Sequence, residues 1–162
     1  HSAGVALLGS VAQTTAATWR RQLEANVVAV AELTRVLLPA LRVARGRVVL
    51  VNSTAGLAAR AGWASYAASK YALRAFADAL RAEESANGVR VTSIFPGRTA
   101  TDMQRAVAEQ EGADYRPEEY LRPESVAGAV LLAVTAPADA ALTELVLRPA
   151  GTAGRDPAKP PR

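Results

Sequence analysis

The chain has 162 residues, of which 50% are hydrophobic and 21% charged, as is typical of one soluble globular domain. It has no cysteine, which excludes disulfides and thiol chemistry, and no run of about 18 uninterrupted apolar residues that would predict a membrane span. The net charge of +4 comes from arginines scattered among acidic residues, which favours a solvated surface over a nucleic-acid partner.

The first half of the chain predicts two helices with one buried strand between them. Residues 18–42 carry apolar side chains at helical spacing, after threonines suited to N-capping. Residues 47–53, RVVLVNS, are rich in β-branched side chains and predict a buried strand. Residues 65–86 predict a second long helix, which ends at Asn87 and Gly88, a C-terminal stop signal.

The second half predicts two more strands and one more helix. Residues 89–95, VRVTSIF, read as a strand, and residues 98–122 as a polar, irregular stretch. A helix is expected at Pro123–Thr135 and a final strand at residues 142–147.

Strands that alternate with helices predict an α/β fold, in which a parallel sheet is covered on both faces and built from right-handed crossovers. We expect one domain over residues 1–151. Residues 152–162 form a proline-containing basic tail that we expect to be disordered.

Four features meet at the predicted carboxyl edge of this sheet, where such folds bind ligands. Ser53 ends one strand, Pro96 and Gly97 end the next, and Tyr66 and Lys70 share a face of the helix between them. Tyr-x-x-x-Lys alone is a weak signal, since an exposed i,i+4 pair would explain it. The strand-end serine before it and the Pro-Gly pair after it make the combination specific.

These residues resemble the short-chain dehydrogenase/reductase family. The similarity starts at Ser2-Ala3-Gly4, includes Asn26 and the segments VNSTAG, SYAASK and PGRTATDM, and runs to about Gly151 in the family's order. The resemblance implies a Rossmann-type doubly wound parallel sheet, of which this chain holds the C-terminal part from the end of the fourth strand onward.

By the same resemblance the chain is a carbonyl reductase or alcohol dehydrogenase that uses NAD(H) or NADP(H). The implied catalytic residues are Asn26, Ser53, Tyr66 and Lys70. The implied cofactor-binding residues are Ala3, Gly4, Tyr66, Lys70, Pro96, Gly97, Thr99 and Thr101. No metal site is expected, since His1 is the only histidine and the acidic residues do not cluster.

The chemistry explains these residue types. A phenol can give a proton to an alkoxide if its pKa falls from about 10 toward working pH, and the nearby Lys70 ammonium favours that change. Ser53 can donate a hydrogen bond to the substrate oxygen. The resemblance implies that Asn26 holds a water in a proton relay to Lys70. Trp63 is read as a wall of the substrate cleft or, equally, as a packing residue.

The family's glycine-rich loop, which cradles the cofactor pyrophosphate, does not occur in this sequence. We therefore expect residues 1–162 alone to be inactive. The resemblance implies that the residue that selects NAD or NADP follows the family's second strand, which these 162 residues do not include. The substrate is expected to be a small carbonyl or alcohol chosen by residues 98–122.

A catalytically silent module that acts in assembly or regulation is the alternative function, and nucleic-acid binding is a distant third. We expect a cytoplasmic protein without a membrane or nucleic-acid partner. The resemblance implies a homodimer or homotetramer in which residues 18–42 and 65–86 pair with their symmetry mates.

Overall fold

The computed structural model describes residues 1–150, so the tail predicted at residues 152–162 lies outside the described residues. In this range no helix has both the length and the apolar composition that a bilayer crossing requires. The helices and strands are α1 (Ala16–Leu23), α2 (Ala29–Val43), β1 (Arg47–Val51), α3 (Ala64–Glu84), β2 (Arg90–Pro96), α4 (Asp102–Gln110), α5 (Pro123–Thr135) and β3 (Glu144–Leu147).

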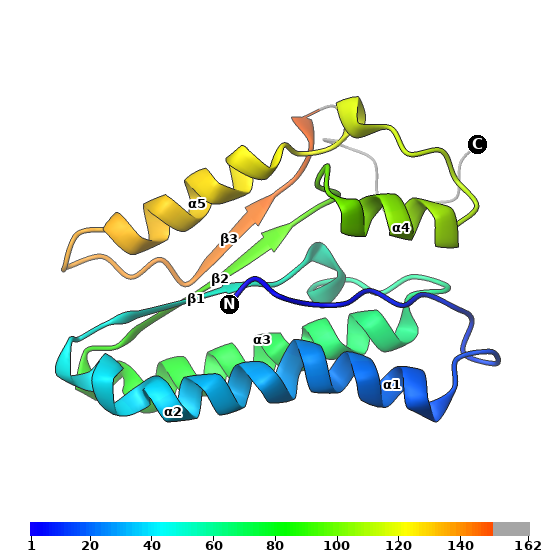
Figure 1. Ribbon diagram of the computed structural model, residues 1–162. Coiled ribbons are helices and arrows are strands. Elements are labelled where there is room, and N and C mark those ends of the chain that lie inside the picture. The colour runs from blue at the N-terminus through cyan, green and yellow to red at the C-terminus, as the bar shows by residue number, and fades with distance from the viewer. Residues whose placement is uncertain (151–162) are drawn as a thin grey trace.

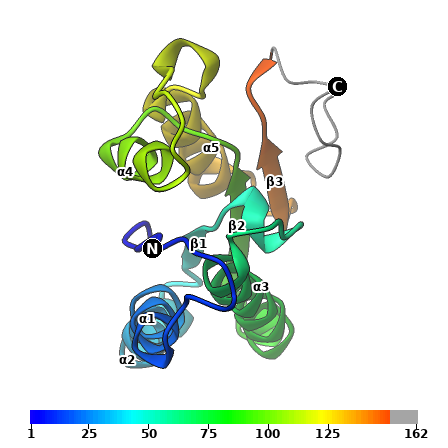
Figure 2. The same cartoon turned by 90° about the vertical axis from the view of Figure 1, so that its right-hand side faces the viewer.

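The three strands form one sheet in the order β1-β2-β3, and both pairs are parallel. Helices α1, α2 and α3 lie on one face of this sheet, and α4 and α5 lie on the other (Figures 1 and 2). The prediction of an α/β fold with a parallel sheet between two helical layers is confirmed. It follows that the carboxyl ends of all three strands meet at one edge.

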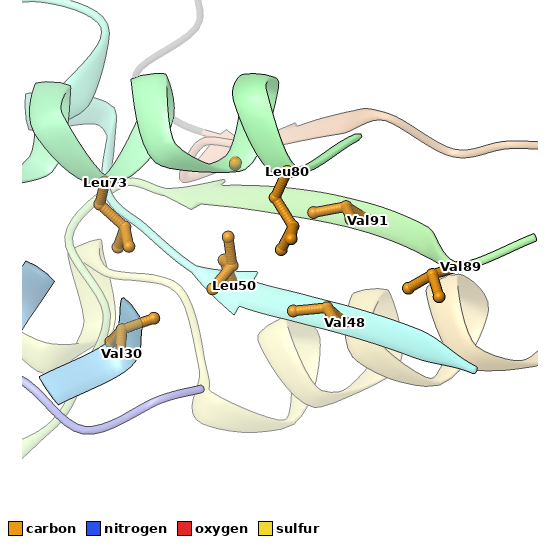
Figure 3. Close-up of a cluster of buried hydrophobic side chains, with 8 residues drawn as sticks. Val30, Val48, Leu50, Leu73, Leu80, Val89 and Val91 are labelled. Carbon is orange, nitrogen blue, oxygen red and sulfur yellow. The ribbon is translucent and has the colours of Figure 1, made fainter. Parts of the chain in front are cut away.

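The core between α3 and the sheet is built from aliphatic side chains of medium size. Leu73 and Leu80 of α3 point toward Leu50 of β1 and Val91 of β2 (Figure 3). Leu50 is fully buried, and Val48, Val89 and Val30 extend the same cluster. Burial of such side chains stabilises the fold by roughly 1.5–3 kcal/mol each, which fixes α3 against the strands.

The single helix predicted at residues 18–42 is in fact two α-helices joined by a π-helical turn. This turn, Glu24–Val28, contains Asn26, and the Ala29 N–H donates to the Glu24 carbonyl five residues earlier. A π-helical turn adds one residue, but the spacing of apolar residues in the helices on either side stays nearly the same. The hydrophobic pattern therefore could not predict the turn. The turn places Asn26 in the interior with 1% of its surface exposed.

The expectation that residues 98–122 are irregular is wrong for α4. The Thr101 side chain caps this helix by accepting a hydrogen bond from the Gln104 N–H at 3.2 Å. Val107 of the helix is buried in a cluster with Ala55, Trp63 and Tyr66. A short 3₁₀ turn, Pro117–Glu119, follows. The helix is short and polar, so its stability depends on contacts with distant segments that the local sequence does not show.

Candidate active site

A cavity of about 640 Å³ opens at the carboxyl edge of the sheet. Three of the predicted catalytic residues, Ser53, Tyr66 and Lys70, line it. Of the predicted cofactor-binding residues, the cavity is also lined by Gly4, Pro96, Gly97, Thr99 and Thr101. Ala3 and Asn26 are not among the lining residues, so the structure brings most of the predicted site, but not all of it, around one space.

Ser53 is fixed by the short turn that follows β1. Its hydroxyl accepts a hydrogen bond from the Ala55 N–H at 3.1 Å, which leaves its own proton to be donated toward the Tyr66 phenol. The turn is docked against α3, because Asn52 Nδ2 donates to the Lys70 carbonyl at 3.1 Å. Gly56 lies so close to the same carbonyl that a Cβ would stand 2.9 Å from it. Ser53 is thereby held at a set distance from the residues on α3.

Tyr66 lies on the first turns of α3 and is almost completely buried. Its ring meets Trp63 edge to face, with the two centroids 5.6 Å apart. Burial raises the pKa of the Tyr66 phenol, and a hydrogen bond with the Ser53 hydroxyl opposes this rise. Among the described residues, Ser53 is therefore the group that lowers the Tyr66 pKa, and the net shift is upward.

Lys70 is 5% exposed and keeps its ammonium inside the protein. Nζ donates to the Val51 carbonyl at a long 3.4 Å and lies 5.8 Å from the centroid of the Tyr66 ring. Burial lowers the pKa of Lys70 to about 8. With one weak hydrogen bond among the described residues, the ammonium has donors left for a ligand in the cavity.

Asn26 ties the N-terminal segment to α3. Its Oδ1 accepts from the Val5 N–H at 2.8 Å, and its Nδ2 donates to the Val5 carbonyl at 2.9 Å and to Ser69 Oγ at 3.0 Å. Both amide protons are therefore engaged within the protein. A Cβ on Gly4 would stand 3.0 Å from Asn26 Oδ1 and 3.9 Å from Lys70 Nζ, so Gly4 separates the two side chains.

Gln22 repeats the Asn26 arrangement one turn earlier, and the sequence reading missed it. Its side chain accepts from the Leu7 N–H at 3.0 Å and donates to the Leu7 carbonyl at 3.1 Å and to Ser65 Oγ at 2.5 Å. The signal was available as two amides four residues apart on one helix, facing two serines four residues apart on the next.

One part of the cavity wall consists of aromatic and basic side chains. Trp63 lines it and donates from Nε1 to Glu111 Oε1 at 3.1 Å, so it serves both as a cleft wall and as a packing residue. Arg98 Nη2 pairs with Glu111 at 2.7 Å. The Arg60 guanidinium stacks on Trp63, 4.4 Å from the ring centroid. Within residues 1–150, no three histidine or acidic side chains gather as a metal site would require.

Comparison with known proteins identifies the family of this chain. Residues 1–112 match the family described as short chain dehydrogenase. The chain is 40% identical over 102 residues to the uncharacterized oxidoreductase YbbO of Escherichia coli K12, with 62% of this chain and 38% of that protein covered. It is 34% identical over 116 residues to dehydrogenase/reductase SDR family member 7B of Bos taurus, with 71% and 36% covered. The chain thus spans well under half the length of these two relatives.

Among solved structures, the closed form of serine dehydrogenase complexed with NADP+ superposes with a TM-score of 0.83 at 26% identity. The similarity covers 99% of this chain and 66% of that one. The crystal structure of serine dehydrogenase from Escherichia coli gives a TM-score of 0.76 at 29% identity, with 91% and 61% covered.

Proposed function

Because this chain belongs to the short-chain dehydrogenase family, we propose that it carries the catalytic part of an oxidoreductase that transfers a hydride between a nicotinamide cofactor and a carbonyl or alcohol substrate. The observation that carries the proposal is the convergence of Ser53, Tyr66 and Lys70 on one cavity at the carboxyl edge of the sheet. Residues 1–151 are the proposed domain.

The donors around the cavity fit such a cofactor. Lys70 has unused ammonium donors, and the hydroxyls of Thr99 and Thr101 line the same space, which suits ribose and phosphate oxygens. Gly97 packs closely against the segment after β3, because a Cβ added to Gly97 would stand 3.2 Å from Pro149. The backbone at Gly97 therefore has little room for a side chain. A related protein was solved with NADP+. When bound, the nicotinamide supplies or accepts the hydride.

We assign the cofactor-facing role to the residues that the sequence predicted. They are Ala3, Gly4, Tyr66, Lys70, Pro96, Gly97, Thr99 and Thr101. All except Ala3 line the cavity, so Ala3 would act only by positioning the residues next to it in the chain.

The chain's own residues would move the proton. As hydride reaches the carbonyl carbon, the oxygen becomes an alkoxide, and Ser53 donates a hydrogen bond that stabilises this charge. The Tyr66 O–H bond breaks and its proton passes to the alkoxide, which completes the alcohol. The Lys70 ammonium stabilises the tyrosinate that is left until a proton returns to it. Oxidation runs the same steps backwards.

Asn26 is the fourth catalytic residue of the proposal. Its side chain is already bonded to Val5 and Ser69, so it would position the segment around Gly4 beside Lys70. The proton relay through a water that the family resemblance implies remains part of the proposal.

The silent-module alternative finds no support in the described residues, because Ser53, Tyr66 and Lys70 all face the same cavity. The discriminating test is Tyr66→Phe in the full-length natural protein. We expect a 10²–10⁴-fold lower kcat, since the general acid is lost, with nicotinamide binding by fluorescence retained. Tyr71→Phe, a change of a half-exposed tyrosine on the same helix, is the matched control and should keep normal turnover. Equal turnover in the two variants would refute the proposal.

A further inference from the structure

One basic side chain of the cavity has no carboxylate partner. Arg60 lines the cavity and is exposed, and within residues 1–150 it makes no ion pair or hydrogen bond to an acidic group. The only hydrogen-bond, ion-pair or ring contact of its side chain there is the stacking on Trp63. The neighbouring Arg98, by contrast, is held by Glu111 at 2.7 Å. Arg60 thus presents a planar set of N–H donors that the protein itself does not use.

The surface beneath Arg60 is rigid. Trp63 is 7% exposed, and its ring is fixed by the hydrogen bond from Nε1 to Glu111 and by the edge-to-face contact with Tyr66. A guanidinium stacked on a fixed ring loses little further freedom when it binds a ligand, which favours affinity. Because the Trp63 ring touches both residues, Arg60 stands one aromatic ring away from the proposed proton donor.

The charge around the cavity favours an anion. The lining contains the cations Arg60, Lys70 and Arg98, and none of its described residues is Asp or Glu. Partial burial of the guanidinium and the nearby Arg98 charge lower the pKa of Arg60, and Glu111 opposes this in part. The guanidinium remains protonated at any physiological pH, so an incoming anion would relieve the repulsion between the two arginines.

We propose that the substrate of this site is a short oxo acid or hydroxy acid, whose carboxylate binds the Arg60 guanidinium while its carbonyl or hydroxyl group reaches Ser53 and Tyr66. The proposal rests on the proposed function and names its substrate class. Guanidinium and carboxylate match in a two-point hydrogen-bonded pair, which would orient the substrate as well as hold it. The Trp63 ring lies between Arg60 and Tyr66. This separation suits a substrate whose carboxylate is a few bonds from the reacting carbon.

The test compares 4-oxopentanoate with its methyl ester, which has the same ketone and no charge. In the full-length natural protein with reduced cofactor, we measure kcat/KM for both and the binding of both by calorimetry in the presence of oxidised cofactor. The variant is Arg60→Gln. The matched control is Arg105→Gln, because Arg105 also stacks on an aromatic ring, Tyr115 at 4.3 Å, but does not line the cavity.

We expect the natural protein to prefer the acid over the ester. Arg60→Gln should weaken binding and kcat/KM for the acid by about 10–100-fold, as the loss of a charge-assisted hydrogen bond does, and leave the ester unchanged. Arg105→Gln should change neither. If neither probe is reduced, the calorimetric ratio of acid to ester still decides the inference, and turnover of other ketones decides the proposed function separately.

Two results would overturn the inference. One is an acid-to-ester ratio that Arg60→Gln leaves unchanged. The other is a loss of cofactor affinity in Arg60→Gln without a change in that ratio, which would assign Arg60 to a phosphate of the cofactor. In either case, reduction of the ester would leave the proposed function standing.

Discussion

The ammonium group of Lys70 is buried, so its charge is largely removed from water. It makes one long hydrogen bond to the Val51 carbonyl, and burial lowers its pKa to about 8. No carboxylate in the cavity lining compensates it. A side chain kept at such a cost to stability is expected where function requires it.

This cost predicts how stability depends on pH. The pKa of Lys70 is about 8 in the folded protein and 10.5 for a lysine without a shift, which represents the unfolded chain. The unfolded chain therefore binds more protons than the folded protein between these two pH values. The free energy of unfolding should therefore rise from about pH 8 to pH 10.5, and the penalty is complete below pH 8. Lys70→Met removes it and should stabilise the cofactor-free protein at pH 7 by on the order of 3 kcal/mol.

Urea unfolding of both proteins across this pH range is the measurement. The advantage of Lys70→Met should shrink as the pH rises through the window and should be accompanied by a loss of turnover. Leu132→Met, at an exposed site without a titratable group, is the control and should show no such pH trend. A stability difference that stays constant over the whole range would show that the ammonium is not the cause.

Lys70→Arg separates charge from chemistry at the same position. The guanidinium keeps the positive charge but is planar, larger and always protonated, so it cannot take the place of a compact amine beside Tyr66 and Gly4. We expect kcat to fall about a hundredfold or more, or about 2.7 kcal/mol of barrier, with the circular dichroism spectrum unchanged. Near-normal turnover and pH dependence in this variant would refute the role given to Lys70.

At the scale of elements, the turn after β1 is positioned by its contact with α3. Gly56→Ala would put a methyl group 2.9 Å from the backbone oxygen of Lys70 and from Asn52 Oδ1, neither of which can move without shifting the helix or the strand end. We expect a loss of 1–3 kcal/mol in unfolding free energy, as for other overpacked sites, and a lower kcat because Ser53 moves relative to Tyr66. Chemical denaturation and steady-state kinetics measure the two effects.

The matched control for this change is Gly128→Ala in α5. No atom lies within 4 Å of the added Cβ at Gly128, so alanine there should be neutral or stabilising by up to about 1 kcal/mol. If Gly56→Ala behaves like Gly128→Ala, the close contact is not important for the position of Ser53.

The elements that were predicted correctly are those with strong local signals. The strands β1 and β2 carry β-branched runs, and α5 was predicted with its bounds because Pro123 begins it and its apolar stretch is continuous. Helix α4 was missed because contacts between distant segments help to hold it, such as the 2.8 Å hydrogen bond between the Leu8 N–H and Gln110 Oε1. Its own sequence is too short and too polar to predict a helix.

The same distinction holds for the candidate site. Ser53, Tyr66 and Lys70 could be predicted because a strand end and an i,i+4 spacing are visible in the sequence. Gln22 was missed although its spacing to Asn26 was visible, because its bond to Ser65 spans 43 residues. Arg60 could not be predicted, since its unpaired guanidinium follows from the Arg98–Glu111 pairing beside it. Side-chain roles of this kind depend on contacts between segments that are distant in the sequence.

At the scale of the whole molecule, α2 leaves an apolar stripe uncovered. Leu33, Val36 and Leu37 occupy one face of this helix and are 50%, 63% and 44% exposed, and Tyr71 of the adjoining α3 is 42% exposed. Contiguous apolar surface of this kind is a common mark of subunit contacts. It supports the expectation that α2 and α3 pair with the same helices of a second copy.

A charge in the middle of this stripe tests that expectation. Val36→Glu would bury two carboxylates near each other across a symmetric interface, so it should shift a dimer or tetramer to monomers at tens of micromolar in light scattering. Val11→Glu replaces a valine that is 72% exposed, against 63% for Val36, in the loop before α1 and should leave the assembly intact. The circular dichroism spectra of both variants should match the natural protein, since neither valine is part of the core. A natural protein that is already monomeric at this concentration, or a Val36→Glu variant that keeps the full mass, would show that the stripe does not form the contact.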